Sequence, residues 1–169
     1  MLEQPTEPTK SVALAAPEKL TDQHDLTQFD CGEPTINDYL AKAVKQQAMK
    51  NAVVYVTCLA NTNIVKGYYT LSNGTVLRTD APSQLSRNSP LQVPVTLLGR
   101  MGIDQTIQGS GYGLDLLKDA IERAFVAAQT VGSKAMIVSP LTPALSQFYK
   151  KHAGFQDLAD GSMTLFLKL

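Results

Sequence analysis

The part of the sequence best suited to chemistry is a glycine-rich segment, QGSGYG, at residues 108–113. Gly109, Gly111 and Gly113 let the backbone turn tightly and expose its N–H groups. An amphipathic pattern begins directly afterwards, and the first turn of a helix adds unpaired N–H donors and the positive end of its dipole. This combination predicts a cradle for a pyrophosphate group that needs no basic side chain.

Two common nucleotide-binding patterns do not fit this segment. A P-loop needs a Lys–Ser/Thr pair after its second glycine, and the sequence has none here. A Rossmann fingerprint needs GxGxxG and an acidic residue about 20 positions later. The spacing here is GxGxG, and Gln129 and Thr130 occupy the later region. The segment does match a third pattern, Gln/Arg-x-x-Gly-x-Gly/Ala, through Gln108, Gly111 and Gly113.

The elements around the glycine segment can be predicted from periodicity. An apolar strand, VTLLGRMGI at 95–103, precedes it, and a long amphipathic helix follows and ends near Gly132. Asp119 and Arg123 are spaced as an i,i+4 pair on the polar side of that helix. The apolar side is predicted to comprise six residues: Leu114, Leu117, Ile121, Ala124, Phe125 and Ala128.

The remaining segments alternate between helical and strand patterns. A helix is expected from Pro34 to Ala48, and strands at 53–60 and 64–74 precede a loop at 80–92. After the long helix come a strand at 134–139, a helix starting at Thr142–Pro143, and a hairpin about Asp160–Gly161. The stripe of that last helix holds Leu145, Phe148, Tyr149 and His152. This order predicts an α/β fold with a mixed sheet.

Length and composition favour one ordinary globular domain. The chain has 169 residues, of which 44% are apolar. We expect a flexible N-terminal arm at 1–17 and a single domain at 18–169. No apolar run is long enough to span a bilayer, and the opening residues do not resemble a secretion signal. The two cysteines, Cys31 and Cys58, are too few for a disulfide framework or a zinc site and fit a reducing cytoplasm.

The zero net charge conceals an uneven distribution. Residues 39–103 carry seven basic residues against one acidic residue, Asp80. This segregation is consistent with a polyanionic partner, and it is equally consistent with a solvated surface. Four basic residues are candidates for contacts with RNA phosphates: Lys42, Lys45, Arg78 and Arg87.

The glycine pattern and its neighbours resemble the Gcn5-related N-acetyltransferase (GNAT) fold, whose co-substrate is acetyl-coenzyme A. Further blocks narrow the resemblance to GNAT-fold toxins of bacterial toxin–antitoxin pairs, the TacT and AtaT type. It covers roughly residues 14–169, and its blocks are FDCGEPTINDYL (29–40), GYYTLSNG (67–74), VPVTLLGRMGID (93–104), the glycine loop and SQFYKKHAGF (146–155).

The resemblance implies a set of site residues. The backbone of Met101, Gly102 and Ile103 would bind the pantetheine arm and polarise the thioester carbonyl. Tyr149 would protonate the departing thiolate. The pyrophosphate would be held by the loop and the start of the helix, comprising Gln108, Gly109, Ser110, Gly111, Tyr112, Gly113 and Leu114.

The composition of the strand at 95–103 also indicates which kind of amine would accept the acetyl group. The strand at 95–103 contains no carboxylate to act as a general base. A lysine amine, with a pKa of about 10.4, must lose a tightly held proton, whereas an α-amine at about 7.7–8.0 is partly free already. The missing carboxylate therefore favours an α-amine, and the basic stretch favours one attached to RNA. Which residue, if any, serves as the base remains open.

Four further residues have simpler interpretations. Arg100, in the middle of an apolar strand, is expected to be paired or near the site, because an unpaired buried charge is costly. His24 and His152 lack metal-ligand spacing and are interpreted as structural. Cys31 is interpreted as a turn or packing residue, since no nearby histidine would activate it.

The resemblance therefore implies a bacterial, cytoplasmic acetyltransferase that acts on the α-amino group of aminoacyl-tRNA and blocks translation, and the residues discussed above are consistent with this acceptor. The resemblance further implies a homodimer and a ribbon-helix-helix antitoxin that contacts DNA, with no metal and no membrane. Two alternatives stay open: an acetyltransferase for a protein or small-molecule amine, and a degenerate GNAT domain that only binds. The preferred aminoacyl-tRNA, the antitoxin surface and the role of the arm are not determined by the sequence.

Overall fold

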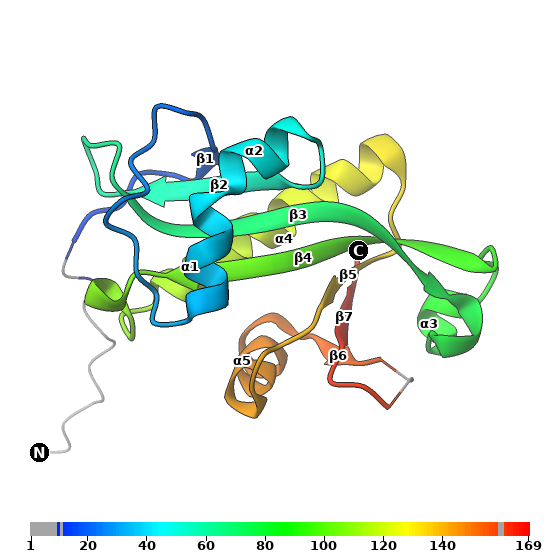
Figure 1. Cartoon of the computed structure of the whole chain (residues 1–169). Helices are drawn as coiled ribbons and strands as arrows, with labels where there is room; N and C mark the ends of the chain where they lie inside the picture. Colours follow the sequence, from blue (N-terminus) through cyan, green and yellow to red (C-terminus); the bar gives the residue numbers. More distant parts are fainter. Residues whose placement is uncertain (1–9, 11, 159–160) are drawn as a thin grey trace, which may run out of the picture.

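The structure is a computed structural model in which residues 10, 12–158 and 161–169 are described. Helices and strands are interspersed along the chain (Figure 1). The strands are β1 (Glu18–Lys19), β2 (Val53–Cys58), β3 (Val65–Leu77), β4 (Gln92–Ile103), β5 (Ala135–Val138), β6 (Gln156–Asp157) and β7 (Leu165–Lys168). The helices are α1 (Pro34–Ala41), α2 (Ala43–Ala48), α3 (Ser83–Ser86), α4 (Tyr112–Val131) and α5 (Pro143–Ala153), with short 3-10 turns η1 (Arg78–Asp80) and η2 (Gln105–Ile107).

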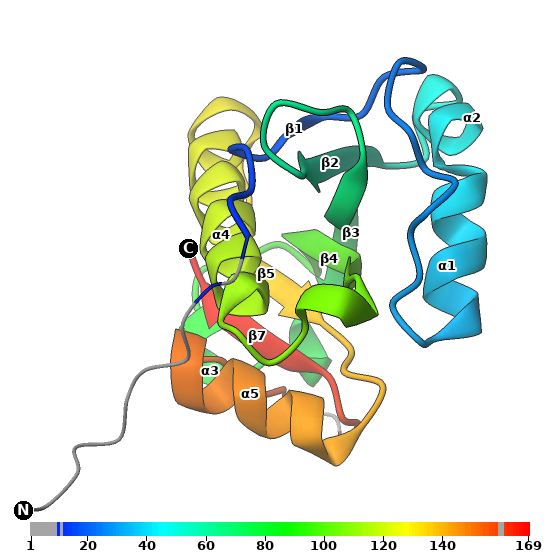
Figure 2. The ribbon, with the colours of Figure 1, turned by 90° about the vertical axis from the view of Figure 1, so that its left-hand side faces the viewer.

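The strands form one mixed sheet in the order β1-β2-β3-β4-β5-β7-β6. All neighbours are antiparallel except β4 and β5, which are parallel. Helices α4 and α5 share a core with one face of the sheet, while α1 and α2 pack on the other face over β2 and β3. Figure 2 shows the sheet between α4 and α1. The predicted α/β fold with a mixed sheet is confirmed.

Strand β4 separates from β5 halfway along its length, and this separation creates the site. The two strands pair only where Val95–Leu98 of β4 meet Ala135–Val138 of β5. On its other edge β4 carries a bulge, because two residues, Gly99 and Arg100, stand opposite Thr70 alone. Strand β4 then continues to Ile103, beyond the end of β5. Its far half therefore borders an opening in the sheet.

Several predicted boundaries were wrong for identifiable reasons. The helix expected at 34–48 is divided at Lys42, whose φ of −108° and ψ of 3° are not helical. The loop expected at 80–92 contains α3, and Leu85 of α3 is fully buried in a core with β5 and β7. The predicted hairpin is present as β6 paired with β7, but its turn residue Asp160 lies outside the described part of the chain.

The predicted apolar face of α4 is confirmed for five of its six residues, since Leu117 and Ala124 are buried and Leu114, Ile121 and Ala128 are half-buried. The fully buried side chains of α4 are Tyr112, Leu116, Leu117, Ala120 and Ala124. Phe125, expected on the apolar face, is 54% exposed. Asp119 and Arg123 do pair, at 3.0 Å, but on the side toward the sheet, where Asp119 accepts a hydrogen bond from the buried Tyr69 hydroxyl at 2.5 Å. The Asp119–Arg123 pair is therefore partly buried against the sheet, and not on the solvent side as predicted.

The arm expected at residues 1–17 falls in part outside the described residues. Its described end lies alongside the domain, where Ala15 donates from its backbone N–H to the carbonyl of Cys58 at 2.8 Å. The Tyr112 hydroxyl hydrogen-bonds the backbone of Val12, and Arg123 donates to the carbonyl of Pro17 at 2.9 Å. Among the described helices, none is both long and apolar enough to cross a membrane.

Candidate active site

The glycine segment leads into α4 through two left-handed backbone positions. Gly109 has a φ of +81° and Gly111, the residue that caps α4, a φ of +90°. A Cβ at Gly109 would meet nothing within 4 Å, so its backbone conformation, not crowding, favours glycine there. The N–H of Asp115 donates to the carbonyl of Gly111 at 3.3 Å. The N–H groups of residues 112–114 therefore have no acceptor within the helix, as expected for a first turn.

Gln108 braces this loop against two neighbouring segments. Its side-chain amide donates to the carbonyl of Ile103 at 2.7 Å and to the carbonyl of Cys31 at 2.9 Å. Both hydrogens of the amide nitrogen are thus used within the protein. Gln108 therefore holds the loop to the end of β4 and to the turn before α1, which explains why the QxxGxG and FDCGE blocks occur together.

Asp104, at the end of β4, fixes the turn into the loop. It is 2% exposed and accepts hydrogen bonds from the N–H groups of Asp30 at 3.1 Å and Thr106 at 3.0 Å. Burial alone would raise its pKa, but these hydrogen bonds and the Lys66 ammonium outweigh burial and lower the pKa of Asp104. The carboxylate stays charged and keeps the strand end, the loop and the Asp30 turn in register.

A crevice runs from the loop along the far half of β4. It consists of two adjoining cavities of about 380 and 250 Å³. The first cavity is lined by six of the residues predicted for the co-substrate: Met101, Gly102, Ile103, Gln108, Gly109 and Gly113. The second is lined by Arg100 and Tyr149, and the two cavities share Met101 and Leu145 among their walls. The crevice therefore connects the predicted pyrophosphate loop to the predicted catalytic tyrosine.

Four predicted residues of the loop and helix start do not line the crevice: Ser110, Gly111, Tyr112 and Leu114. The Tyr112 side chain is buried and hydrogen-bonds the backbone of Val12. Only the backbone N–H of Tyr112 is therefore available for the predicted contact with the pyrophosphate. Sequence reasoning missed the apolar walls formed by Ile36 and Leu141. The only signal for Ile36 was helical periodicity, which does not distinguish a core residue from a crevice residue.

Tyr149 lies on α5 with its ring packed edge-on against Phe148 and Phe155. The residue is 5% exposed, and burial raises the pKa of its phenol to about 12. Its hydroxyl has no hydrogen-bond partner among the described residues. Every fully buried side-chain oxygen among the described residues has a hydrogen-bond partner. Because the Tyr149 oxygen has none, it cannot be fully buried and must open onto the cavity that Tyr149 lines. The hydroxyl is a protonated, unengaged donor at neutral pH.

Arg100 is near the site, as predicted, but it is exposed and not buried. Its guanidinium carbon lies 4.1 Å from the ring centroid of Tyr39 on α1. No carboxylate or histidine lines the Tyr149 cavity among the described residues. The geometry thus offers an acid and a cation at this end of the crevice, and no evident base.

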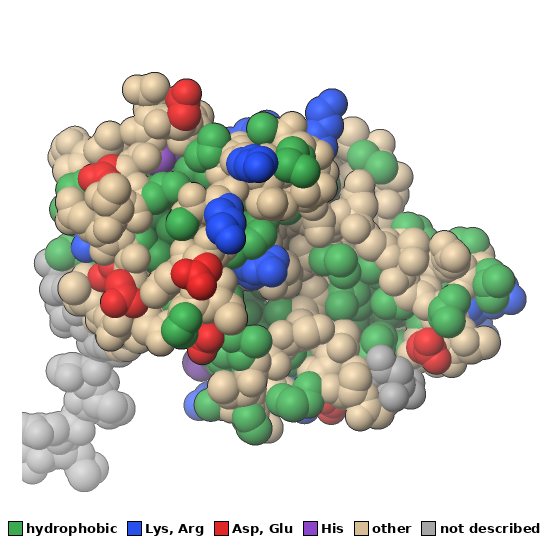
Figure 3. Space-filling model, viewed as in Figure 1, with side chains coloured by type: hydrophobic (Ala, Val, Ile, Leu, Met, Phe, Trp, Pro, Cys, Tyr) green, Lys and Arg blue, Asp and Glu red, His purple; other side chains and the backbone are tan. Residues whose placement is uncertain are grey.

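The four candidate RNA-binding residues fall in two separate places. Lys42 and Lys45 are exposed at the junction of α1 and α2 and on α2. Arg78 and Arg87 flank α3 at the opposite end of the β3–β4 hairpin, where Arg78 also donates to the carbonyl of Ser89 at 3.0 Å. Figure 3 shows basic side chains over α1 and α2, and others at the end where α3 lies.

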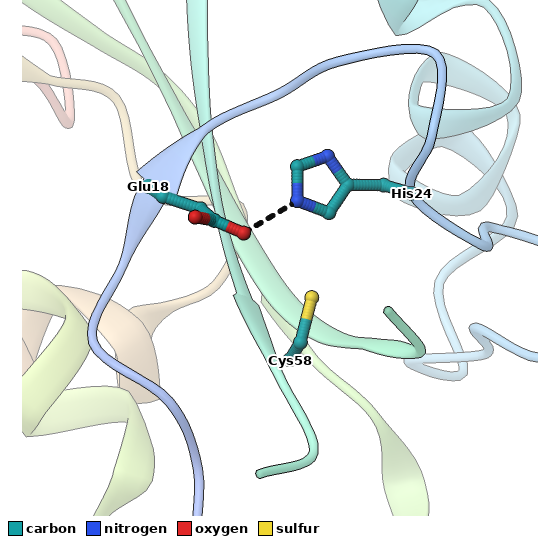
Figure 4. A group of neighbouring side chains, drawn as sticks. All are labelled: Glu18, His24 and Cys58. Atoms are coloured by element: carbon teal, nitrogen blue, oxygen red, sulfur yellow. Dashed lines mark hydrogen bonds and ion pairs between the residues drawn. The ribbon is translucent and has the colours of Figure 1, made fainter. Parts of the chain in front are cut away.

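The fold also brings together Glu18, His24 and Cys58, which sequence spacing did not reveal (Figure 4). The Nδ1 atom of His24 accepts a hydrogen bond from the N–H of Thr21 at 2.9 Å, so the neutral ring carries its proton on Nε2. That nitrogen contacts Glu18 at 2.7 Å. Both ring nitrogens are thus engaged without a metal, which agrees with a structural role for His24.

Neither cysteine is an activated nucleophile. Burial, with a contribution from Glu18, raises the pKa of the Cys58 thiol to about 11. Burial also raises the pKa of Cys31, whose sulfur lies 3.7 Å from the carbonyl of Glu33 in the turn before α1. Thiols with raised pKa values are poor nucleophiles at neutral pH. The interpretation of Cys31 as a turn and packing residue fits this geometry.

A scan of the sequence against models of known protein families finds no match. Individual proteins do match. A tRNA-acetylating toxin of Mycobacterium tuberculosis is 40% identical over 136 residues, which cover 80% of this chain and 81% of the toxin. The structure of AtaT complexed with acetyl-methionyl-tRNAfMet superposes with a TM-score of 0.84 at 32% identity, covering 92% of this chain and 95% of AtaT.

AtaT is also known bound to acetyl-CoA and to the C-terminus of its antitoxin AtaR, in a tyrosine-to-phenylalanine variant. That structure has a TM-score of 0.76 at 32% identity and covers 92% of each chain. The KacTA–DNA complex superposes with a TM-score of 0.76 at 30% identity, covering 92% of this chain and 93% of the other. With its loop, crevice and tyrosine arranged as described, this chain belongs to the family of GNAT-fold, tRNA-acetylating toxins of toxin–antitoxin systems.

Proposed function

We propose that this protein transfers the acetyl group of acetyl-CoA to the α-amino group of aminoacyl-tRNA and thereby blocks translation. The observation that carries the proposal is the continuous crevice from the glycine loop to Tyr149, along the half of β4 that β5 leaves uncovered. Its length suits an extended thioester substrate with a diphosphate at one end. Its far end opens beside a tyrosine hydroxyl and an arginine.

The residues of the loop fit the diphosphate of acetyl-CoA. The N–H groups of residues 112–114 have no helical acceptor, and the dipole of the 20-residue helix α4 places positive potential at the same point. Gly109, Ser110 and Gly111 contribute further backbone donors in this proposal. Gln108 acts by bracing the loop, because its amide hydrogens already bind Ile103 and Cys31.

The pantetheine arm is expected to lie along β4. Residues 101–103 of this strand have a neighbour, β3, on one edge and lie beyond the reach of β5 on the other. Their backbone can therefore pair with the amides of pantetheine as a further strand would. The apolar walls, including Phe148 and Leu145, exclude water from the thioester.

The reaction then requires only one side-chain proton donor. The acceptor amine attacks the thioester carbonyl, a C–N bond forms and the C–S bond breaks. Tyr149 gives its proton to the departing thiolate, and the amine's extra proton passes to solvent or back to the phenolate. With a pKa near 12, the phenol is protonated whenever the amine is ready to react. Among the described residues the Tyr149 cavity is lined by no carboxylate or histidine, and Glu33 lines the adjoining cavity beside the loop. The lack of a base next to Tyr149 suits an α-amine, which is partly unprotonated at neutral pH.

The partners follow from the family. The proposal includes a cognate antitoxin of the ribbon-helix-helix type, which would contact DNA, a homodimer, and a cytoplasmic location where tRNA is found. Lys42 and Lys45, at the junction of α1 and α2 and on α2, are the more favourable pair for the tRNA acceptor arm, because the start of α1 lines the crevice through Thr35 and Ile36. Arg78 and Arg87 would contact the tRNA only at a distance from the crevice.

The test uses the full chain, labelled acetyl-CoA and three acceptors: bulk aminoacyl-tRNA, the same tRNA after deacylation, and a lysine-containing peptide. We expect label on aminoacyl-tRNA alone, released as an N-acetyl amino acid after mild alkali. Label on the peptide instead would favour the protein-amine alternative. Label on no acceptor, with coenzyme A still binding, would favour a degenerate domain and overturn the proposal.

A further inference from the structure

Arg100 is held in an unusual position by the bulge in β4. Its backbone N–H donates to the Thr70 hydroxyl at 3.1 Å, at the point where Gly99 and Arg100 together face Thr70. A Cβ on Gly99 would lie 2.8 Å from that hydroxyl oxygen, so the bulge requires glycine there. The bulge therefore fixes where the side chain of Arg100 leaves the strand, at the mouth of the Tyr149 cavity.

The guanidinium is further held by a column of two aromatic rings. It lies 4.1 Å from the ring centroid of Tyr39, and Tyr39 is nearly parallel to Tyr68, with 6.4 Å between centroids. Tyr68 is fully buried and donates its hydroxyl hydrogen to the carbonyl of Ile36 at 2.6 Å. The column gives Arg100 one preferred orientation although the residue is exposed.

Arg100 has no ion-pair partner among the described residues, in contrast to Arg123, which also lies over a tyrosine ring but is paired with Asp119. One face of its planar guanidinium is covered by Tyr39, and its N–H donors are left free beside the cavity. A fixed, unpaired guanidinium is a site for a phosphate, which it binds through two parallel hydrogen bonds. The shared cavity with Tyr149 places this cation next to the point where the acceptor amine must react.

We propose that Arg100 binds the phosphate of the terminal nucleotide that carries the aminoacyl group, and that Tyr39 positions Arg100 for this contact. The inference rests on the proposed function. In an aminoacyl-tRNA the amino acid is esterified to the terminal ribose, so the 5′ phosphate of that nucleotide is the anion nearest the reacting amine. Arg100 is then a specificity residue, which makes a nucleotide phosphate part of what the enzyme recognises.

The experiment compares two small acceptors that differ only in that phosphate. They are 3′-O-aminoacyl-adenosine and 3′-O-aminoacyl-adenosine 5′-monophosphate, carrying the amino acid that is acetylated in bulk tRNA. For the wild-type chain we expect kcat/KM to be about 10- to 100-fold higher with the phosphate, the usual range for a hydrogen bond to a charged group. Arg100→Gln should bring this ratio to about one, because it should lower kcat/KM for the phosphorylated acceptor far more than for the unphosphorylated one.

Two further variants separate recognition from folding. Tyr39→Phe keeps the ring and should keep the ratio, whereas Tyr39→Leu should reduce it with a melting temperature close to that of Tyr39→Phe. Lys118→Gln removes an exposed cation on α4 and should leave the ratio at the wild-type value. An unchanged ratio in Arg100→Gln, or an equal loss with both acceptors, would overturn the assignment alone. Wild-type inactivity toward both small acceptors and bulk aminoacyl-tRNA would overturn the proposed function and this inference with it.

Discussion

Replacing Tyr149 by phenylalanine isolates the proton transfer to the leaving thiolate. The hydroxyl has no partner among the described residues, so its removal leaves no unsatisfied group, and the ring keeps its contacts with Phe148 and Phe155. We expect the free energy of unfolding to change by less than about 0.5 kcal/mol. The melting temperature of Tyr149→Phe should therefore match that of the wild type.

Activity should respond very differently. A positioned general acid contributes about 10²- to 10⁴-fold, or roughly 3–5 kcal/mol of the barrier. We expect kcat to fall by that factor, while the affinity for coenzyme A stays the same because the hydroxyl is at the other end of the crevice from the loop. The assay measures released coenzyme A with aminoacyl-tRNA as acceptor. Tyr55→Phe, which alters a tyrosine on β2 outside the crevice, is the matched control.

The pH dependence provides an independent check. The pKa of Tyr149 is about 12, so the phenol is protonated throughout the accessible range and adds no descending limb below pH 10. Wild-type kcat/KM should rise with pH as the acceptor amine loses its proton, and the profile of Tyr149→Phe should be parallel and lower. A loss of activity smaller than about tenfold, or a profile that changes shape, would show that Tyr149 is not the acid.

Three more perturbations test the loop, the strand end and the core. Gly111→Asp should abolish acetyl-CoA binding in calorimetry, because a carboxylate at the cap of α4 would accept hydrogen bonds from the N–H groups that the proposal assigns to the phosphates. The left-handed φ of +90° at this position should also lower the melting temperature, and unchanged affinity would refute the cradle. Asp104→Asn should lower the free energy of unfolding at pH 7 by about 1.5–3 kcal/mol in urea titrations. Folding lowers the pKa of Asp104, so its contribution to stability is present above its ordinary pKa of 3.8 and is lost as the pH falls below that value. The unfolding free energies of the variant and the wild type should therefore converge in acid. A difference that stays constant with pH would contradict this linkage. Leu117→Ala should cost about 2–5 kcal/mol and Phe125→Ala less than about 1 kcal/mol, and the reverse order would show that α4 buries a different face.

Much of the fold could be predicted because each element carries its own local signal. The Thr142 cap is one case, since its side chain accepts the N–H of Leu145 as the Thr-Pro start predicts. Gly154 ends α5 in a left-handed conformation, again as glycine at that position predicts. Such signals depend on a few neighbouring residues. The alternating glycines of the loop belong to the same class, because glycine is the residue that adopts positive φ angles without steric cost, and Gly109 and Gly111 both do so.

What the sequence by itself determined is therefore the order of most elements, the glycine-rich turn before α4 and the family resemblance, all of which depend on residues close together in the chain. Only the tertiary structure decided that Asp104 ties the strand end to Asp30, and that Glu18, His24 and Cys58 meet. It also decided that Arg100 is exposed and held by Tyr39 beside Tyr149. The physical reason is that these contacts join residues distant in sequence, and their geometry depends on a bulge and on the parting of β4 from β5, which no local pattern encodes.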